Sequence, residues 1–278
     1  MVTNKGEGME SHSFGARPRK QLGQHWLKSE AVLSQIVEAA QSDDSLSQDR
    51  LLEIGPGTGA LTRRLLATSV HVTAVELDRH LCEKLRQQFQ NEPKFQLIEG
   101  DILALDLRAV NAQKVVANIP YYITGPILEL LLGKIASPNP QPFESIVLLV
   151  QKEVAQRICA EPGSRAFGAL TVRVQYLAAC EWVCVVPAKS FQPPPKVDSA
   201  VIKLMPRPFL VQAKDPSKLE TLVKVGFATK RKMLRNNLKG IVERDRLFSI
   251  YEDLGIKPEA RAEELSVEQW VMLSNQLA

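Results

Sequence analysis

Short apolar runs alternate with longer segments of helical periodicity, and this alternation limits the possible fold more than any other feature of the chain. Seven runs are typical of strands, at residues 51–55, 70–76, 95–100, 115–118, 146–151, 182–186 and 200–205. Between them, helices are predicted at residues 59–67, 78–89, 126–134 and 152–160. Strands that alternate with helices indicate a parallel sheet covered on both faces. We therefore expect an α/β fold with a mostly parallel, seven-stranded sheet.

The strand pattern stops near residue 206, and this predicts a second, smaller domain. Residues 206–216 contain three prolines, and residues 218–278 show only helical periodicity, with a break at 255–258. We expect a flexible N-terminal tail at 1–15, an α/β domain at 16–206 and a C-terminal α-helical domain at 207–278. The tail is polar and has no hydrophobic signal core. No apolar run approaches the length of a membrane span, so we expect a cytoplasmic protein.

Basic residues are concentrated in one late segment. Residues 224–246 carry eight Lys or Arg against two acidic residues, a net charge of +6 in a chain whose total is +4. Four of these residues recur at intervals of 7, 4 and 4, which would place them on one helix face: Lys224, Arg231, Arg235 and Lys239. Such a stripe is ordinarily a solvated charged face. The local excess of charge instead favours contacts with nucleic-acid phosphates.

The four cysteines give no metal signature. Cys180 and Cys184 are close in sequence, but no second pair and no histidine follow them. We expect all four to be ordinary buried thiols of a reducing compartment, and no metal site.

A glycine-rich turn follows the first predicted strand, in the sequence Leu51-Leu-Glu-Ile-Gly-Pro-Gly-Thr-Gly-Ala-Leu61. Gly55, Gly57 and Gly59 would let the backbone approach a ligand at a helix N-terminus. Glu76 ends the next strand, where a carboxylate can accept two ribose hydroxyls. Asp101 follows the third strand and can take an adenine amino hydrogen. This pattern predicts a nucleoside ligand.

The glycine turn by itself is compatible with two alternatives. One is a tight turn without a ligand, and the second is the loose dinucleotide fingerprint Gly55-x-Gly57-x-x-Ala60 of an oxidoreductase. Pro56 removes an amide donor, which suits pyrophosphate poorly. The chain also lacks an evident hydride-transfer group such as a Tyr-x-x-x-Lys set.

The sequence Asn118-Ile-Pro-Tyr-Tyr-Ile-Thr124 follows the fourth predicted strand and can grip a planar amine. The Asn118 side-chain oxygen and the Pro120 carbonyl could each accept one hydrogen of adenine N6. If the ligand is a sulfonium methyl donor, these bonds would aim the nitrogen lone pair at the methyl group. Tyr121 could stack on the base. Alternatively, Asn118 caps the next helix and Pro120 only shapes a turn.

Phe191 lies in the proline-rich sequence Ser190-Phe-Gln-Pro-Pro-Pro-Lys196. A ring presented on such a stiff loop could stack on the opposite face of an extruded base. An ordinary core phenylalanine would lie in an apolar run, which is absent here.

Together these motifs resemble those of the bacterial small-subunit ribosomal RNA adenine N6,N6-dimethyltransferases. The matching segments are Lys20-Gln-Leu-Gly-Gln-His-Trp-Leu27, Glu53-Ile-Gly-Pro-Gly57, Asn118-Ile-Pro-Tyr121, Phe191-Gln-Pro-Pro-Pro-Lys-Val-Asp-Ser199 and the basic Lys230-Arg-Lys-Met-Leu-Arg-Asn-Asn237. The resemblance implies a Rossmann-like class I methyltransferase domain and a small helical RNA-binding domain. It also implies S-adenosyl-L-methionine as donor and dimethylation of two adjacent adenosines in the 3′-terminal hairpin of 16S rRNA, within the assembling 30S subunit. We expect a monomer.

The resemblance also implies which residues contact the donor: His25, Leu27, Gly55, Glu76, Asp101 and Asn118, to which the glycine turn adds Gly57. Two positions depart from the family pattern, which usually has Asn in place of His25 and commonly Asn in place of Tyr122. A lone histidine is often only structural.

The family resemblance extends to mitochondrial transcription factors, so a non-catalytic binding protein is an alternative. The intact Asn118-Ile-Pro-Tyr121 sequence favours catalysis.

Overall fold

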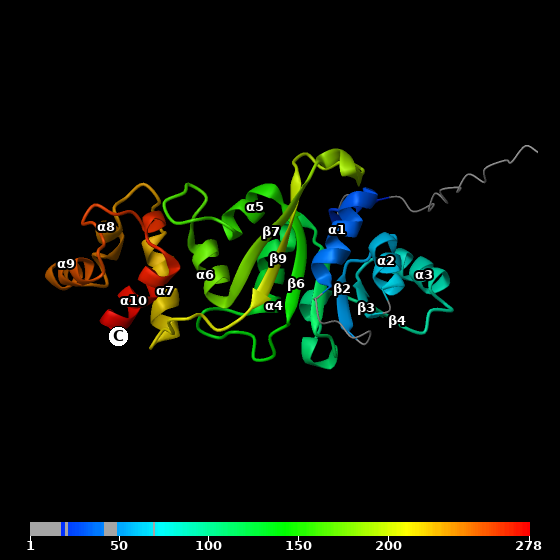
Figure 1. The fold of residues 1–278 in the computed structure, drawn as a ribbon, viewed down its shortest axis with the longest axis horizontal. Helices are drawn as coiled ribbons and strands as arrows, with labels where there is room; N and C mark the ends of the chain where they lie inside the picture. Colours follow the sequence, from blue (N-terminus) through cyan, green and yellow to red (C-terminus); the bar gives the residue numbers. More distant parts are fainter. Residues whose placement is uncertain (1–17, 20–21, 42–48, 69) are drawn as a thin grey trace, which may run out of the picture.

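A seven-stranded sheet forms the centre of the molecule (Figure 1). The structure is a computed structural model that describes residues 18–19, 22–41, 49–68 and 70–278. The predicted tail at 1–15 lies outside the described residues. The strand order is β4-β3-β2-β5-β6-β9-β7. The strands are β2 (Arg50–Ile54), β3 (His71–Glu76), β4 (Phe95–Glu99), β5 (Lys114–Asn118), β6 (Ser145–Gln151), β7 (Ala178–Val186) and β9 (Ser199–Pro206).

The sheet confirms the prediction of a mostly parallel, seven-stranded arrangement. From β4 to β6 all pairs are parallel, and β9 runs antiparallel to both of its neighbours. The predicted strand ends were accurate to about one residue, except that β7 begins at Ala178 rather than Trp182. The apolar runs of β5 and β6 are buried throughout, as expected for strands with a helix layer on each side.

Helices cover both faces of the sheet, because neighbouring strand residues point to opposite sides. Val116, Val147 and Leu149 face one buried cluster with α1 (Glu30–Ala40) and α2 (Ala60–Ala67). Val115, Ile146 and Leu148 face the other, with α4 (Thr124–Leu132), α5 (Lys152–Ile158) and α6 (Ala169–Leu177). Helix α3 (Arg79–Gln88) packs beside β3 and β4.

The elements after Pro206 are helices, as predicted: α7 (Pro216–Gly226), α8 (Leu234–Leu238), α9 (Arg244–Asp253) and α10 (Val267–Leu277). They lie at the opposite end of the molecule from α2 and α3 (Figure 1). Trp270 of α10 is fully buried, its ring centroid 5.4 Å from that of Phe227, which in turn lies 6.4 Å from Phe167. One buried cluster therefore runs from the sheet into these helices, and the division at residue 206 stays a prediction.

The prediction of one continuous basic helix was wrong. Helix α7 ends at Gly226 and α8 begins at Leu234, so the four predicted cations do not share a helix face. The chain turns here because Leu234 and Trp270 both pack against Gly226, and Asn237 Nδ2 donates to the Gly226 carbonyl at 2.6 Å. Of these four residues, Lys224, Arg231 and Lys239 are exposed. The fourth, Arg235, is half-buried with its guanidinium 5.9 Å from the Phe248 ring centroid.

A small antiparallel sheet, which the sequence did not predict, joins two distant segments. It pairs β1 (Trp26–Leu27) with β8 (Phe191–Gln192). The Lys28 N–H also donates to the Ser190 carbonyl at 2.9 Å. This pairing fixes residues 22–28, here called the N-terminal strap, beside the proline-rich loop at 187–196.

Candidate active site

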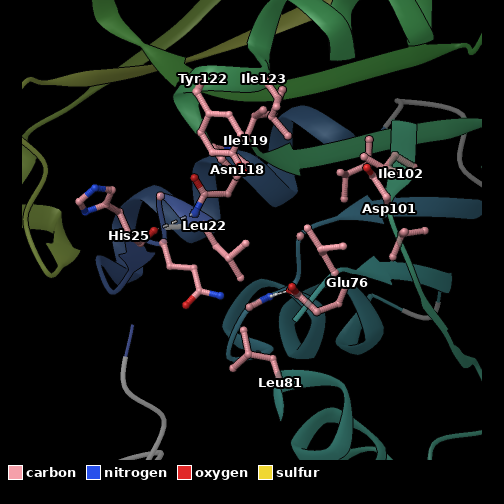
Figure 2. Close-up of a pocket in the computed structure, with 18 of the residues that line it drawn as sticks. Leu22, His25, Glu76, Leu81, Asp101, Ile102, Asn118, Ile119, Tyr122 and Ile123 are labelled. Carbon is pink, nitrogen blue, oxygen red and sulfur yellow. Dashed lines mark hydrogen bonds between the residues drawn. The ribbon is translucent and has the colours of Figure 1, made fainter. Parts of the chain in front are cut away.

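A pocket opens where the parallel strands β2, β3 and β5 end (Figure 2). Ligands of open parallel sheets bind at this carboxyl edge. The structure brings eight of the predicted site residues together in the lining of this pocket: His25, Gly55, Gly57, Glu76, Asp101, Asn118, Pro120 and Tyr121. The N-terminal strap closes one side.

The glycine turn after β2 has a backbone conformation that side chains rarely adopt. Gly55, Gly57 and Gly59 have φ angles of +70°, +60° and +78°. A Cβ at Gly57 would lie 3.2 Å from the Trp26 ring, and one at Gly59 only 2.9 Å from the Phe89 ring. Glycine is required here both for the turn and for the close approach of the strap.

Glu76 is buried and already accepts two backbone hydrogen bonds. Its carboxylate receives the Gly57 N–H at 3.1 Å and the Asp78 N–H at 2.9 Å. Burial raises the pKa of Glu76, and these two bonds partly offset the effect. Each carboxylate oxygen has a second lone pair, so ribose hydroxyls can still bind.

Asp101 is exposed at the pocket wall. Its Oδ1 accepts the Leu103 N–H at 2.9 Å, which leaves Oδ2 for an adenine amino group. Ligand contact by Glu76 and Asp101 remains a prediction that their positions support.

Asn118 has the orientation that an amine acceptor needs. Its Nδ2 donates to the His25 carbonyl at 3.2 Å, and no hydrogen bond among the described residues uses its Oδ1. No side chain caps α4, so a helix-capping role for Asn118 is excluded. The Pro120 carbonyl accepts the Ile123 N–H at 3.1 Å and therefore does shape a turn, with one lone pair left.

Two tyrosines follow Pro120 and differ in their surroundings. Tyr121 is half-buried, and its hydroxyl lies 2.7 Å from Ser199 Oγ. Burial raises the pKa of Tyr121. Tyr122 is 62% exposed at the pocket rim, against Gly23 of the strap.

His25 and Leu27 both belong to the strap, and of the two only His25 lines the main pocket. The imidazole of His25 is turned away from the carboxylates of Glu76 and Asp101 (Figure 2). Its Nδ1 lies 2.8 Å from the Pro193 carbonyl instead. Leu27 is 8% exposed and lines a smaller cavity beneath the glycine turn.

The prediction that Phe191 is presented on the surface was wrong. Its side chain is 1% exposed and belongs to the buried cluster that contains Leu27 and Val201. Pairing of β1 with β8 turns Phe191 inward and Gln192 outward, because strand residues alternate between faces. A base could reach this ring only if the cluster opened.

Glu53 is a charged group at the site whose role the sequence pattern did not reveal. It lines the smaller cavity, which shares Gly55, Gly57 and Asn118 with the main pocket. Its side chain is 2% exposed, and burial raises its pKa to about 7 although Thr62 donates a hydrogen bond of 2.6 Å. The sequence signal was a carboxylate between Leu52 and Ile54 in a buried strand.

The described residues contain no candidate metal site, since no three of their His, Cys, Asp or Glu side chains lie close enough to hold an ion. All four cysteines are free, and burial raises the pKa of each thiol. No helix of this part of the chain is sufficiently long and apolar to span a membrane.

Comparison with known proteins identifies the protein family to which this chain belongs. Residues 15–278 match the family described as "Ribosomal RNA adenine dimethylase". The chain belongs to the ribosomal RNA adenine dimethylase family. As a member it is an rRNA adenine dimethyltransferase, which implies S-adenosylmethionine as donor and excludes the oxidoreductase alternative. The predicted family, fold and enzyme class are thereby confirmed.

Similar members of the dimethylase family include two proteins named "Ribosomal RNA small subunit methyltransferase A". The one from Nostoc punctiforme is 58% identical over 273 residues, covering 94% of this chain and 96% of its own. That from Thermosynechococcus vestitus is 57% identical over 261 residues, covering 94% and 97%.

Two crystal structures show the same dimethylase fold. A dimethyladenosine transferase from Plasmodium falciparum has a TM-score of 0.72 and 27% identity, over 90% of this chain and 96% of that chain. The 23S rRNA methyltransferase ErmE has a TM-score of 0.73 and 26% identity, over 91% and 99%.

Proposed function

We propose that the protein dimethylates the N6 amino groups of two adjacent adenosines in the 3′-terminal hairpin of 16S rRNA, within the assembling 30S subunit. The fold alone does not select the ribosomal subunit, because ErmE, named for 23S rRNA, is equally similar in structure. Identities of 57–58% to small-subunit methyltransferases support the small subunit. We propose that it acts in the cytoplasm, as a monomer and without a metal ion.

The two cavities fit S-adenosylmethionine, which supplies an electrophilic methyl group when bound. Glu76 and Asp101 retain acceptor capacity and would hold the nucleoside part. The smaller cavity beside Glu53 would take the methionine part. Asn118 and the glycine turn line both cavities, so they would hold the middle of an extended donor.

The observation that carries the proposal is the orientation of the Asn118 amide. Because its Nδ2 is bonded to the His25 carbonyl, its Oδ1 is the free end. Adenine N6 is a poor nucleophile, since its lone pair is delocalised into the ring. Acceptance of its two hydrogens by Asn118 Oδ1 and the Pro120 carbonyl would favour tetrahedral geometry and aim the lone pair, which is catalysis by positioning. No strong base is needed, because the nitrogen becomes acidic only after methylation.

The test is transfer of labelled methyl groups to small subunits that lack them, followed by mapping on the rRNA. We expect two methyl groups on each of two adjacent adenosines of the 3′-terminal hairpin. Label on large-subunit rRNA or on another nucleotide would contradict the proposal. Tight subunit binding without any transfer would favour the non-catalytic alternative.

Two further measurements test the proposed monomeric state and the proposed independence of a metal ion. Light scattering in dilute solution is expected to give the mass of one chain, 30.9 kDa. Turnover is expected to be unchanged by a chelator, and its loss with recovery on adding one metal would refute metal independence.

A further inference from the structure

We propose that the His25 side chain is a positioning residue on the acceptor side of the site, where it fixes the ring of Tyr121, and that it does not hold the methyl donor. This inference rests on the proposed function, because Tyr121 is the residue expected to face the target base. It assigns a role to a histidine at a position where Asn is usual in the family.

The imidazole of His25 is held by two contacts. Nδ1 lies 2.8 Å from the Pro193 carbonyl, and a carbonyl oxygen can only accept a hydrogen bond. Nδ1 must therefore carry the hydrogen, in the neutral ring as well as in the protonated one. The ring plane lies at 17° to that of Tyr121, with centroids 6.1 Å apart, which is a stacked arrangement.

Tyr121 is restrained at two points as a result. Its hydroxyl is 2.7 Å from Ser199 Oγ, and Ser199 is fully buried at the start of β9. This bond fixes the far end of the ring but leaves its tilt free. The stacked imidazole restricts the tilt, so His25 and Ser199 together define how the ring faces the pocket.

The backbone of residue 25 has a separate task. Its carbonyl accepts the Asn118 Nδ2 hydrogen at 3.2 Å and so orients the amide that grips the amine. This bond does not depend on the side chain, and a substitution at position 25 can leave it intact. His25 lines the main pocket, but its imidazole is turned away from Glu76 and Asp101 (Figure 2), and His25 is not among the residues that line the smaller cavity. Donor affinity should therefore not depend on the imidazole.

The position of His25 follows from the small sheet between the strap and the proline-rich loop. The pairs Trp26 with Gln192 and Leu27 with Phe191 set the register that places His25 opposite Pro193. His25 therefore links three segments at the acceptor side, namely the strap, the proline-rich loop and the turn after β5.

The experiment compares three substitutions of His25 with a matched control. His25→Ala removes both contacts, His25→Phe keeps a flat ring without the N–H donor, and His25→Gln keeps a donor without the ring. The control is His71→Ala, an exposed histidine where β3 begins, at the opposite edge of the sheet. Steady-state methylation of small subunits gives kcat and KM, and calorimetry gives the Kd of S-adenosylmethionine.

We expect His25→Ala to lower kcat on the order of 10- to 100-fold, the loss typical of a misplaced reacting group, with donor Kd within about twofold. The Phe and Gln variants should each recover part of the loss, and the control should match the wild type. Thermal unfolding identifies any variant that fails to fold. If Ala is such a variant, Phe and Gln carry the test.

A double-mutant cycle asks whether His25 acts through Tyr121. In a Tyr121→Ala background, His25→Ala should cause little further loss, because the ring that it positions is gone. Losses that multiply independently would overturn the inference, as would a donor affinity that falls in step with kcat, or a His25→Ala enzyme with wild-type kcat. Absence of transfer by the wild-type enzyme would instead refute the proposed function.

Discussion

Asn118 is the side chain through which the turn after β5 would act on the methyl acceptor. We expect Asn118→Ala to reduce kcat by about 10²- to 10³-fold, as for loss of one preorganised hydrogen-bonding group at a reacting centre. Asn118→Asp should be similarly impaired, because a carboxylate oxygen would then face the His25 carbonyl in place of the Nδ2 donor. Single-turnover methylation of small subunits measures both. Near-normal rates with bound RNA would contradict catalysis by positioning.

Glu53 gives a prediction about stability rather than catalysis. The pKa of its carboxyl rises from an ordinary 4.5 to about 7 in the folded protein, because it is buried. Between these pH values the folded protein holds a proton that the unfolded chain releases. The contribution of this carboxyl to the free energy of unfolding is therefore fully present below pH 4.5 and is lost as the pH rises through about 7. At 1.4 kcal/mol per pKa unit, the loss is up to about 3 kcal/mol.

Replacing Glu53 by Gln should remove this pH dependence. Urea unfolding of Glu53→Gln and the wild type at pH 5, 6, 7 and 8 should give a difference that grows with pH in favour of Gln. Any packing that the substitution loses lowers the free energy of unfolding by the same amount at every pH. Glu38→Gln, at an exposed position of α1, is the control and should leave the pH dependence unchanged. Parallel curves for Glu53→Gln would show that the carboxyl is ionised throughout.

At the scale of single residues, the place of a residue relative to a predicted strand indicated which side chains line the pocket. It did not indicate where the rings of Phe191 and His25 lie. Glu76 and Asn118 end parallel strands and Asp101 lies two residues beyond the end of another, so they had to meet at one edge of the sheet. The burial of Phe191 and the orientation of His25 depend on a two-residue pairing between distant segments. No local pattern in the sequence contains that information.

Among the helical elements, Gly226 at the end of α7 packs directly against Trp270 of α10. An added Cβ would lie 2.3 Å from Trp270 Cη2 and 3.0 Å from Leu234. Alanine is intrinsically better than glycine in a helix by about 1 kcal/mol, but overpacking a core costs about 1–3 kcal/mol. Because Trp270 is fully buried and cannot move freely, we expect the clash to dominate.

Gly226→Ala is therefore expected to destabilise the protein by up to about 2 kcal/mol in urea unfolding, the difference between these two effects. Gly240→Ala is the matched control, since nothing lies within 4 Å of a Cβ there. A variant at Gly226 as stable as the wild type would mean that Trp270 can repack.

The contact between Gly226 and Trp270 also shows which elements the sequence could predict. Strands such as β6 were found because an apolar run is bounded by polar residues within the chain itself. The break between α7 and α8 escaped prediction although Gly226, a residue type common at helix ends, marks it, because the intervals between the cations fit one continuous helical period. The helix ends where Trp270, far away in sequence, packs against it. Local sequence therefore predicted the ends of most strands more accurately than it predicted the end of this helix.

At the scale of the whole molecule, charge is unevenly distributed along its length. The helical end contains residues 224–246 with a net charge of +6, and the rest of the chain is about −2. Helix α3 lies at the other end (Figure 1). A polyanion would therefore be attracted to the helical end. The break after Gly226 spreads its exposed cations over α7, the following turn and the end of α8, which widens the surface that they can cover.

We expect the triple change Lys224→Gln, Arg231→Gln and Lys239→Gln to weaken binding to small subunits while donor binding is unchanged. These three side chains are exposed, so their loss should not disturb packing, whereas Arg235 contacts Phe248 and is kept. Each lost phosphate contact should lower the slope of log affinity against log salt concentration by about 0.7–0.9. The control is Arg79→Gln, an exposed cation of α3 at the opposite end. If the triple variant and the control show the same slope as the wild type, the helical end makes no phosphate contacts through these residues, and the charge asymmetry serves another purpose.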